Sequence, residues 1–167
     1  MIKVKLSSIF VEDQNKALKF YTEILGFEKK VDVPVGEHAW LTVGHEKSEF
    51  ELLLEPNVHP AAKSYQKAIY KDGIPSTMFF VDDLNVEFER LTSLGVNFKS
   101  EPTEMGGVKI AVFDDTCGNL IPTSITRGID KLVEKFLVEV KIRKKGATPV
   151  LYIRTEKEVQ KCEVALG

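Results

Sequence analysis

One stretch of this sequence is written twice. Residues 10–27 read FVEDQNKALKFYTEILGF, and residues 80–98 read FVDDLNVEFERLTSLGVNF. At an offset near 70, Phe10–Val11 aligns with Phe80–Val81, and the helix-like segments that follow align as well. A repeat of this length predicts that the chain folds as two copies of one supersecondary unit that share a core.

Each copy presents its expected elements in the same order. A β-compatible run comes first, over residues 4–11 in one copy and residues 77–81 in the other. Asp13 and Asp83 then stand where a helix N-cap belongs, and apolar residues at helical spacing follow them. A glycine ends each helix, and three further β-like runs complete the copy. The sequence therefore predicts a βαβββ unit, twice.

This pattern divides the chain into four parts. We expect a first module over residues 1–57, a linker helix over 58–73, a second module over 74–126 and a C-terminal extension over 127–167. A chain of 167 residues is long enough for two such modules around one core. The predicted class is α+β, with two βαβββ modules forming a cupped mixed sheet and an added extension.

Two motifs resemble a known family. The segment over residues 10–27 and the turn DDTCGN over residues 114–119 are similar to the glyoxalase/bleomycin-resistance/extradiol-dioxygenase superfamily, also called vicinal oxygen chelate. The resemblance covers residues 3–126. It implies paired modules whose sheets curl into a U-shaped cup, a homodimer, and a small-molecule site inside the cup. A shared fold by itself establishes no activity.

Strand alternation predicts which residues face that site. In HAWLTV, Ala39, Leu41 and Val43 share the packed face, so the residues between them point to the cleft. The predicted cleft residues, chosen in this way, are Ser8, Phe10, His38, Trp40, Glu51, Ser76, Met78, Phe80 and Phe113. They form a mostly apolar wall with a few polar groups, which is typical of a small-molecule site. Burial in a dimer interface or under the extension is an equal alternative for Phe10 and Phe80.

The resemblance also implies four positions that hold a divalent metal in metal-dependent members. Carried over one at a time, these positions fall on Leu6, Glu51, Ser76 and Pro122. Only Glu51 offers a strong oxygen donor, and a metal needs several donors that converge on one point. We therefore expect no metal cofactor. A divalent ion held in an atypical site with Glu51 remains an alternative, as does an acid–base pair of His38 with Glu51.

The remaining features restrict the function further. The chain has two widely separated cysteines, and we expect Cys117 to be a structural residue of a turn. No apolar run is long enough to span a membrane and no secretory signal is recognisable, so a cytoplasmic protein without membrane contact is expected. Residues 127–167 carry ten Lys and Arg against six Asp and Glu. Their basic residues form one short cluster without aromatic neighbours, and we expect no nucleic-acid partner.

The extension follows a different pattern. Apolar residues at helical spacing predict an amphipathic helix over residues 129–142, followed by a strand at PVLYIRT and a terminal helix at EKEVQKCEVAL. Such an apolar stripe must be buried against something, which could be the outer face of the cup, the dimer partner or the cleft.

Three functions remain open from the sequence. The first is binding of a small organic molecule in the cup without a metal, as in bleomycin-resistance-type sequestration. The second is a glyoxalase-type lyase or isomerase, or a dioxygenase, that uses Glu51 as a catalytic residue with an atypical metal site. The third is a protein that contacts a partner through its extension.

Overall fold

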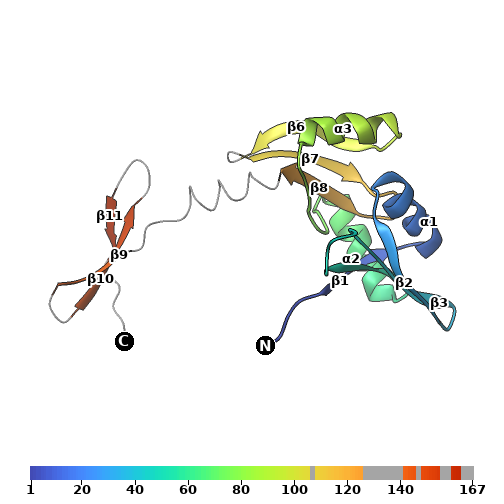
Figure 1. The fold of residues 1–167 in the computed structure, drawn as a ribbon, viewed down its shortest axis with the longest axis horizontal. Coiled ribbons are helices and arrows are strands. Elements are labelled where there is room, and N and C mark those ends of the chain that lie inside the picture. Colours follow the sequence, from blue (N-terminus) through green and yellow to red (C-terminus); the bar gives the residue numbers. More distant parts are fainter. Residues whose placement is uncertain (106–107, 126–140, 146–147, 155–158, 163–167) are drawn as a thin grey trace.

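The computed structural model describes residues 1–105, 108–125, 141–145, 148–154 and 159–162 (Figure 1). The first module consists of one strand, a helix that continues into a π-helical turn, and three further strands. These are β1 (Leu6–Val11), α1 (Gln14–Lys19), η1 (Phe20–Ile24), β2 (Glu28–Val35), β3 (His38–Gly44) and β4 (Glu51–Pro56). They form a sheet of order β1-β4-β3-β2, here called the first sheet, in which β1 runs parallel to β4.

The second module repeats this arrangement after the linker helix α2 (Pro60–Lys71). Its elements are β5 (Phe79–Val81), α3 (Leu84–Ser93), β6 (Phe98–Met105), β7 (Val108–Asp114) and β8 (Leu120–Ile125). The second sheet has the order β5-β8-β7-β6, with β5 parallel to β8. The predicted α+β class with two βαβββ modules is confirmed, although β1 and β5 each begin two residues later than expected.

The residues that were predicted to cap and to end the helices do so in both copies. The carboxylates of Asp13 and Asp83 accept backbone N–H bonds at 2.8–3.2 Å from the first turns of α1 and α3. Gly26 and Gly95 follow the helices with φ of 80° and 82°, a conformation that glycine adopts without strain.

The first helix differs from its sequence pattern in one respect. It widens into the π-helical turn η1, where the N–H of Leu25 donates to the carbonyl of Phe20 at 3.1 Å. The hydroxyl of Thr22 also donates to the Leu18 carbonyl at 2.7 Å. The widened turn buries Phe20 and Tyr21 together, and both lie in the core cluster that joins the two modules.

That core lies on one face of each sheet. Ile9, Leu41 and Leu54 of the first sheet and Phe113 and Ile121 of the second belong to a single buried cluster with α1 and α3. Phe27 and Phe79 make an edge-to-face contact across the modules, with ring centroids 5.4 Å apart. The opposite face of the first sheet is therefore the one left for the predicted cleft.

The C-terminal strands form a sheet of their own, with the order β11-β10-β9. Its strands are β9 (Lys141–Lys145), β10 (Thr148–Arg154) and β11 (Val159–Cys162). The expected strand at PVLYIRT is confirmed as β10. The expected terminal helix is wrong over Val159–Cys162, which pairs in antiparallel fashion with β10 (Figure 1), and its other positions lie outside the described residues. A β-favouring partner strand outweighs a weak helical pattern.

The predicted amphipathic helix over 129–142 falls mostly outside the described residues, and its last two positions already belong to β9. None of the helices in the described ranges combines the length and apolar character needed to cross a bilayer.

Candidate functional site

Five of the predicted cleft residues lie on one face of the first sheet, the face away from α1. We call this surface the cleft face; the residues are Ser8, Phe10, His38, Trp40 and Glu51. The parallel register pairs Leu6 with Glu51, Ser8 with Leu53 and Phe10 with Glu55. Since residues two apart on a strand share a face, these pairs place Glu51 and Glu55 on the same surface as Ser8 and Phe10.

Glu51 is held in place by a residue that the sequence analysis did not single out. The hydroxyl of Thr42 donates to Glu51 Oε2 at 2.6 Å. Thr42 is fully buried, although strand alternation places it on the cleft face between Trp40 and Gly44. A short bond from a buried hydroxyl fixes the direction in which the carboxylate points.

His38 and Glu51 do not form an acid–base pair. Val43 lies opposite Leu52, so Glu51 is at the level of Gly44, whereas His38 begins β3 at its other end. Six strand positions separate them, which is roughly 20 Å at about 3.4 Å per residue.

The four metal-ligand positions do not suit a divalent metal centre. Leu6 and Glu51 are register partners, so the first pair of positions does meet in space. Leu6 has no donor atom, however, so Glu51 is the only ligand that this pair of positions offers. In the second module Pro122 lies on β8 opposite Val112, and Ser76 precedes β5. One carboxylate with no histidine or second carboxylate beside it is too small a donor set for such an ion.

The described residues contain no group of three or more His, Cys, Asp or Glu side chains that could hold a metal.

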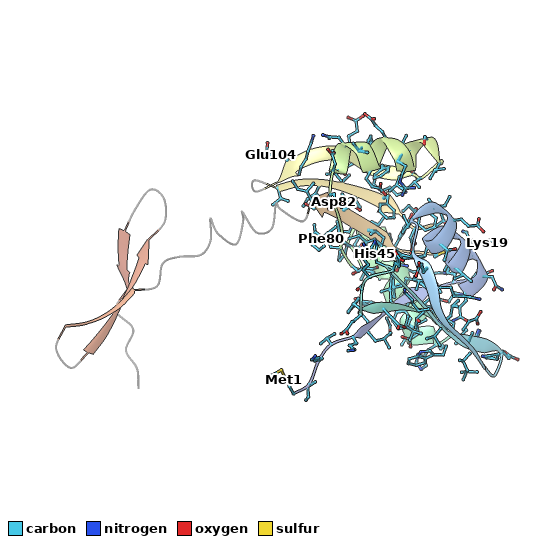
Figure 2. The ribbon with its side chains drawn as sticks, viewed as in Figure 1. Met1, Lys19, His45, Phe80, Asp82 and Glu104 are labelled. Carbon is cyan, nitrogen blue, oxygen red and sulfur yellow. The ribbon has the colours of Figure 1, made fainter. Side chains whose placement is uncertain are left out.

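Three other predicted cleft residues line a different space. Met78, Phe80 and Phe113 border a cavity of about 410 Å³ between the two modules, here called the inter-module cavity. Figure 2 labels Phe80 of the second module and His45 of the first, and both side chains border this cavity. Phe113 is buried and packs its ring against Phe20 and Phe98. The predicted set thus divides between two surfaces.

Ser76, the last of the predicted residues, is exposed, and its hydroxyl donates at 3.0 Å to Asn119 Oδ1 at the edge of a buried hydrogen-bonded cluster. We call this cluster the turn network; it consists of Tyr21, Asn57, Gln66, Ser76, Asp115 and Asn119. Gln66 Nε2 donates to the carbonyls of Phe10 and Cys117 at 2.7 and 3.1 Å. Asn119 Nδ2 donates to the Phe10 carbonyl at 2.9 Å. The network therefore ties α2 and the 114–119 turn to the end of β1.

Asp115 is the charged centre of the turn network. Its Oδ1 accepts the N–H groups of Cys117 and Asn119 at 2.8 and 2.9 Å, and its Oδ2 accepts the Tyr21 hydroxyl at 3.0 Å. Burial raises the pKa of Asp115, and the hydrogen bonds from Asn119, Cys117 and Tyr21 oppose this rise. Burial together with the Asp115 charge raises the pKa of Tyr21 well above its usual value. The role of Asp115 is structural, because its hydrogen bonds hold the 114–119 turn in place.

Cys117 is a turn residue, as expected. It is 1% exposed, and burial raises the pKa of its thiol to about 12, with the Asp115 charge adding to the rise. Only the thiolate is nucleophilic, so this cysteine is protected in two ways. In a Cys162→Ser variant at pH 8, we expect iodoacetamide to leave Cys117 unmodified in the native protein and to modify it within minutes in urea. Intact mass measures the difference; rapid native alkylation would contradict this assignment.

Sequence reasoning missed Thr42 and most of the inter-module cavity. Alternation gave the side on which Thr42 lies, but only the register brings it to Glu51. Met78, Phe80 and Phe113 were predicted to line a cleft, but the first-sheet part of the cavity wall, with Val43 and Leu52, has the strand parity that was interpreted as packed core.

Comparison with known proteins agrees with this architecture. Residues 4–122 match the model of the Glyoxalase/Bleomycin resistance protein/Dioxygenase superfamily, and the chain belongs to this superfamily.

Among its relatives is the uncharacterized protein YurT of Bacillus subtilis (strain 168), which is 58% identical over 122 residues, 72% of this chain and 96% of YurT. The crystal structure of UcmS2 is similar with a TM-score of 0.66 and 33% identity, over 74% of this chain and 98% of UcmS2. TnmS3, an antibiotic binding protein from Streptomyces sp. CB03234, is similar with a TM-score of 0.61 and 27% identity, over 75% of this chain and 96% of TnmS3.

Proposed function

We propose that the protein binds a flat aromatic molecule with a basic amine on its cleft face, and sequesters it without converting it. The observation that carries the proposal is Trp40. It is the single tryptophan of the chain and is 46% exposed in the middle of β3, opposite Val33, which is 52% exposed. Exposed apolar side chains that adjoin on a sheet offer a surface on which a ring system can stack.

The charges on this face favour a cationic ligand. Glu51 and Glu55 share the surface, and the Thr42 bond aims the Glu51 carboxylate. A protonated amine would pair with the Glu51 carboxylate, and the ring system of the same molecule would extend along β3 towards Trp40. A mostly apolar wall with one or two fixed polar groups gives both affinity and orientation.

The residues at the four metal-ligand positions and the similarity to TnmS3 favour binding over catalysis. Three of the four ligand positions lack the usual metal donors, and TnmS3, which is 27% identical, is an antibiotic binding protein. We propose that this chain also acts by sequestration and needs no metal. We further propose that a second copy of the chain covers the cleft face and closes the cup. Analytical ultracentrifugation should then give twice the monomer mass.

The test uses the only tryptophan as its reporter. We expect 9-aminoacridine, a flat cation, to quench Trp40 fluorescence saturably, and acridine-9-carboxylate, which has the same ring and the opposite charge, to bind much more weakly. Glu51→Gln should weaken 9-aminoacridine binding by at least about tenfold, because a hydrogen bond to a charged group contributes about 1.5–3 kcal/mol. Trp40→Ala should weaken it about tenfold by calorimetry, through loss of stacking.

Glu46→Gln is the matched control, because Glu46 is an exposed acid in the turn between β3 and β4. It should leave the affinity unchanged. Equal binding of the two acridines, or unchanged binding in Trp40→Ala, would rule out this site. Calorimetry with Ni²⁺, Zn²⁺, Mn²⁺ and Fe²⁺ addresses the enzyme alternative: stoichiometric metal binding that disappears in Glu51→Gln would favour it over sequestration.

A further inference from the structure

The inter-module cavity lies on the opposite side of the sheets from the cleft face. Several of its strand residues share the parity of the buried core: Ser7 with Ile9, Leu52 with Leu54, and Thr123 with Ile121. Gly44 and Phe80 also border it and have the other parity. Trp40 and Glu51 have the other parity and do not border it. A molecule in this cavity would therefore be separated from the cleft face by the first sheet.

The walls of the cavity are apolar and well ordered by packing. Aromatic surface comes from Phe27 in the loop before β2, Phe79 in β5 and Phe113 in β7, and the edge-to-face contact of Phe27 with Phe79 orients both rings. Glu87 is the only Asp, Glu, Lys or Arg side chain that borders it among the described residues, and both of its oxygens bind Arg90 at 2.6–2.9 Å. A cationic ligand would find no free carboxylate there, and His45 is the only other ionisable side chain among the described residues that border the cavity, so the walls suit a neutral molecule best.

One polar group in this wall has no partner. Thr123 is 3% exposed, and its hydroxyl is the only buried side-chain nitrogen or oxygen without a hydrogen bond among the residues that the structure describes. Leaving a buried hydroxyl unpaired is costly, and native proteins seldom do so without a reason. Thr123 borders the cavity, but its hydroxyl has less than 1 Å² of exposed surface, so a rotation about the Cα–Cβ bond of Thr123 is needed before a ligand oxygen can accept from it.

A second irregular feature adjoins the same space. The π-helical turn η1 ends at Ile24, and the next three residues, Leu25 to Phe27, form part of the wall. Such turns interrupt an otherwise regular helix and are frequent at functional sites.

We propose that the inter-module cavity is a second binding site, for a neutral and mainly apolar molecule that carries one acceptor oxygen, such as an aryl or alkyl ketone or ester. The Thr123 hydroxyl donates to that oxygen, and the phenylalanine walls hold the apolar body. A volume of about 410 Å³ lies within the usual range for small-molecule pockets. The site is independent of the amine-binding cleft face.

The experiment uses prodan, a neutral naphthyl ketone whose emission moves to shorter wavelength in an apolar site. Titration of the full chain should give a saturable blue shift. Thr123→Val keeps the shape and removes the hydroxyl, so prodan affinity should fall about fivefold while the melting temperature does not fall.

Ser7→Phe and Ser8→Phe form a matched pair, because these exposed neighbours on β1 point to opposite faces. Ser7→Phe should abolish prodan binding and leave 9-aminoacridine binding intact, and Ser8→Phe should leave prodan binding intact. Equal effects of the two substitutions on prodan would overturn the proposal. So would a Thr123→Val protein with unchanged prodan affinity and a lower melting temperature, since the hydroxyl would then serve the fold alone.

Discussion

Replacing Asp115 with alanine should lower the free energy of unfolding by about 4 kcal/mol. The substitution leaves the N–H groups of Cys117 and Asn119 and the hydroxyl of Tyr21 without their acceptor in a buried site. Each orphaned buried donor costs about 1–3 kcal/mol, and removing a desolvated charge offsets part of the total. Urea unfolding followed by circular dichroism measures the loss.

Asp32→Ala is the control, since Asp32 is an exposed strand residue whose carboxylate pairs only with Lys29. Its free energy of unfolding should change by less than about 1 kcal/mol. An equal loss in both variants would contradict the role assigned to the turn network.

The pH dependence of the free energy of unfolding tests the role of Asp115 in a second way. Because burial raises the pKa of Asp115 in the folded state, the folded protein takes up this proton before the unfolded chain does as the pH falls. The part of the Asp115 contribution that is linked to this proton is then greatest at low pH and is lost as the pH rises through the folded pKa, whereas the hydrogen bonds to the turn persist. The difference in stability between the wild type and Asp115→Ala should therefore widen between pH 7 and about pH 4.5. A stability difference that narrows as the pH falls would show that folding lowers the pKa of Asp115 and does not raise it.

Replacing Gly118 with alanine should cost about 3 kcal/mol for two separate reasons. Gly118 has a φ of 97°, which strains any residue with a Cβ. The new Cβ would also lie 2.8 Å from Nε2 of Gln66. That amide group is buried and bonded to Phe10, Cys117 and Asn119, so moving it away breaks several bonds of the turn network.

A double-mutant cycle separates the two reasons. Gln66→Ala removes the side chain that the new Cβ meets, so Gly118→Ala should cost at least about 1 kcal/mol less in that background. Gly36→Ala is the control for backbone strain alone, because Gly36 has a φ of 62° and nothing within 4 Å of an added Cβ. It should cost about 1–2 kcal/mol. Additive effects of Gly118→Ala and Gln66→Ala would show that the two side chains do not compete for space.

Local signals account for the parts of the fold that were predicted well. Asp13 and Asp83 cap their helices through bonds to residues two and three positions along the chain, and Gly26 and Gly95 end them by their own φ. Interactions of such short range can be inferred from spacing alone. The terminal strand β11 was missed because its stability depends on pairing with β10 rather than on its own propensity.

The candidate site was predicted less completely. Alternation placed Trp40 and Glu51 on a common face, since side-chain direction follows from strand periodicity. It also placed Ser76 and Phe113 on the cleft, but Ser76 donates to Asn119 in the turn network and Phe113 packs in the core. Strand alternation predicts the face of the strand on which a side chain lies. It does not predict which residues of the other module pack against that face.

The sequence by itself determined the repeated βαβββ architecture and the helix ends, because each depends on residue identity and short-range spacing. It also gave the residue types at Leu6, Ser76 and Pro122, none of which is a His, Asp or Glu. Only the tertiary structure decided where the modules leave space. The bond from Thr42 to Glu51, the cavity between the modules and the unpaired hydroxyl of Thr123 all arise from the register of strands and the packing of elements that are far apart in the chain. Such contacts depend on how one strand or module packs against another, whereas the periodic pattern of a sequence describes only the faces of a single strand or helix.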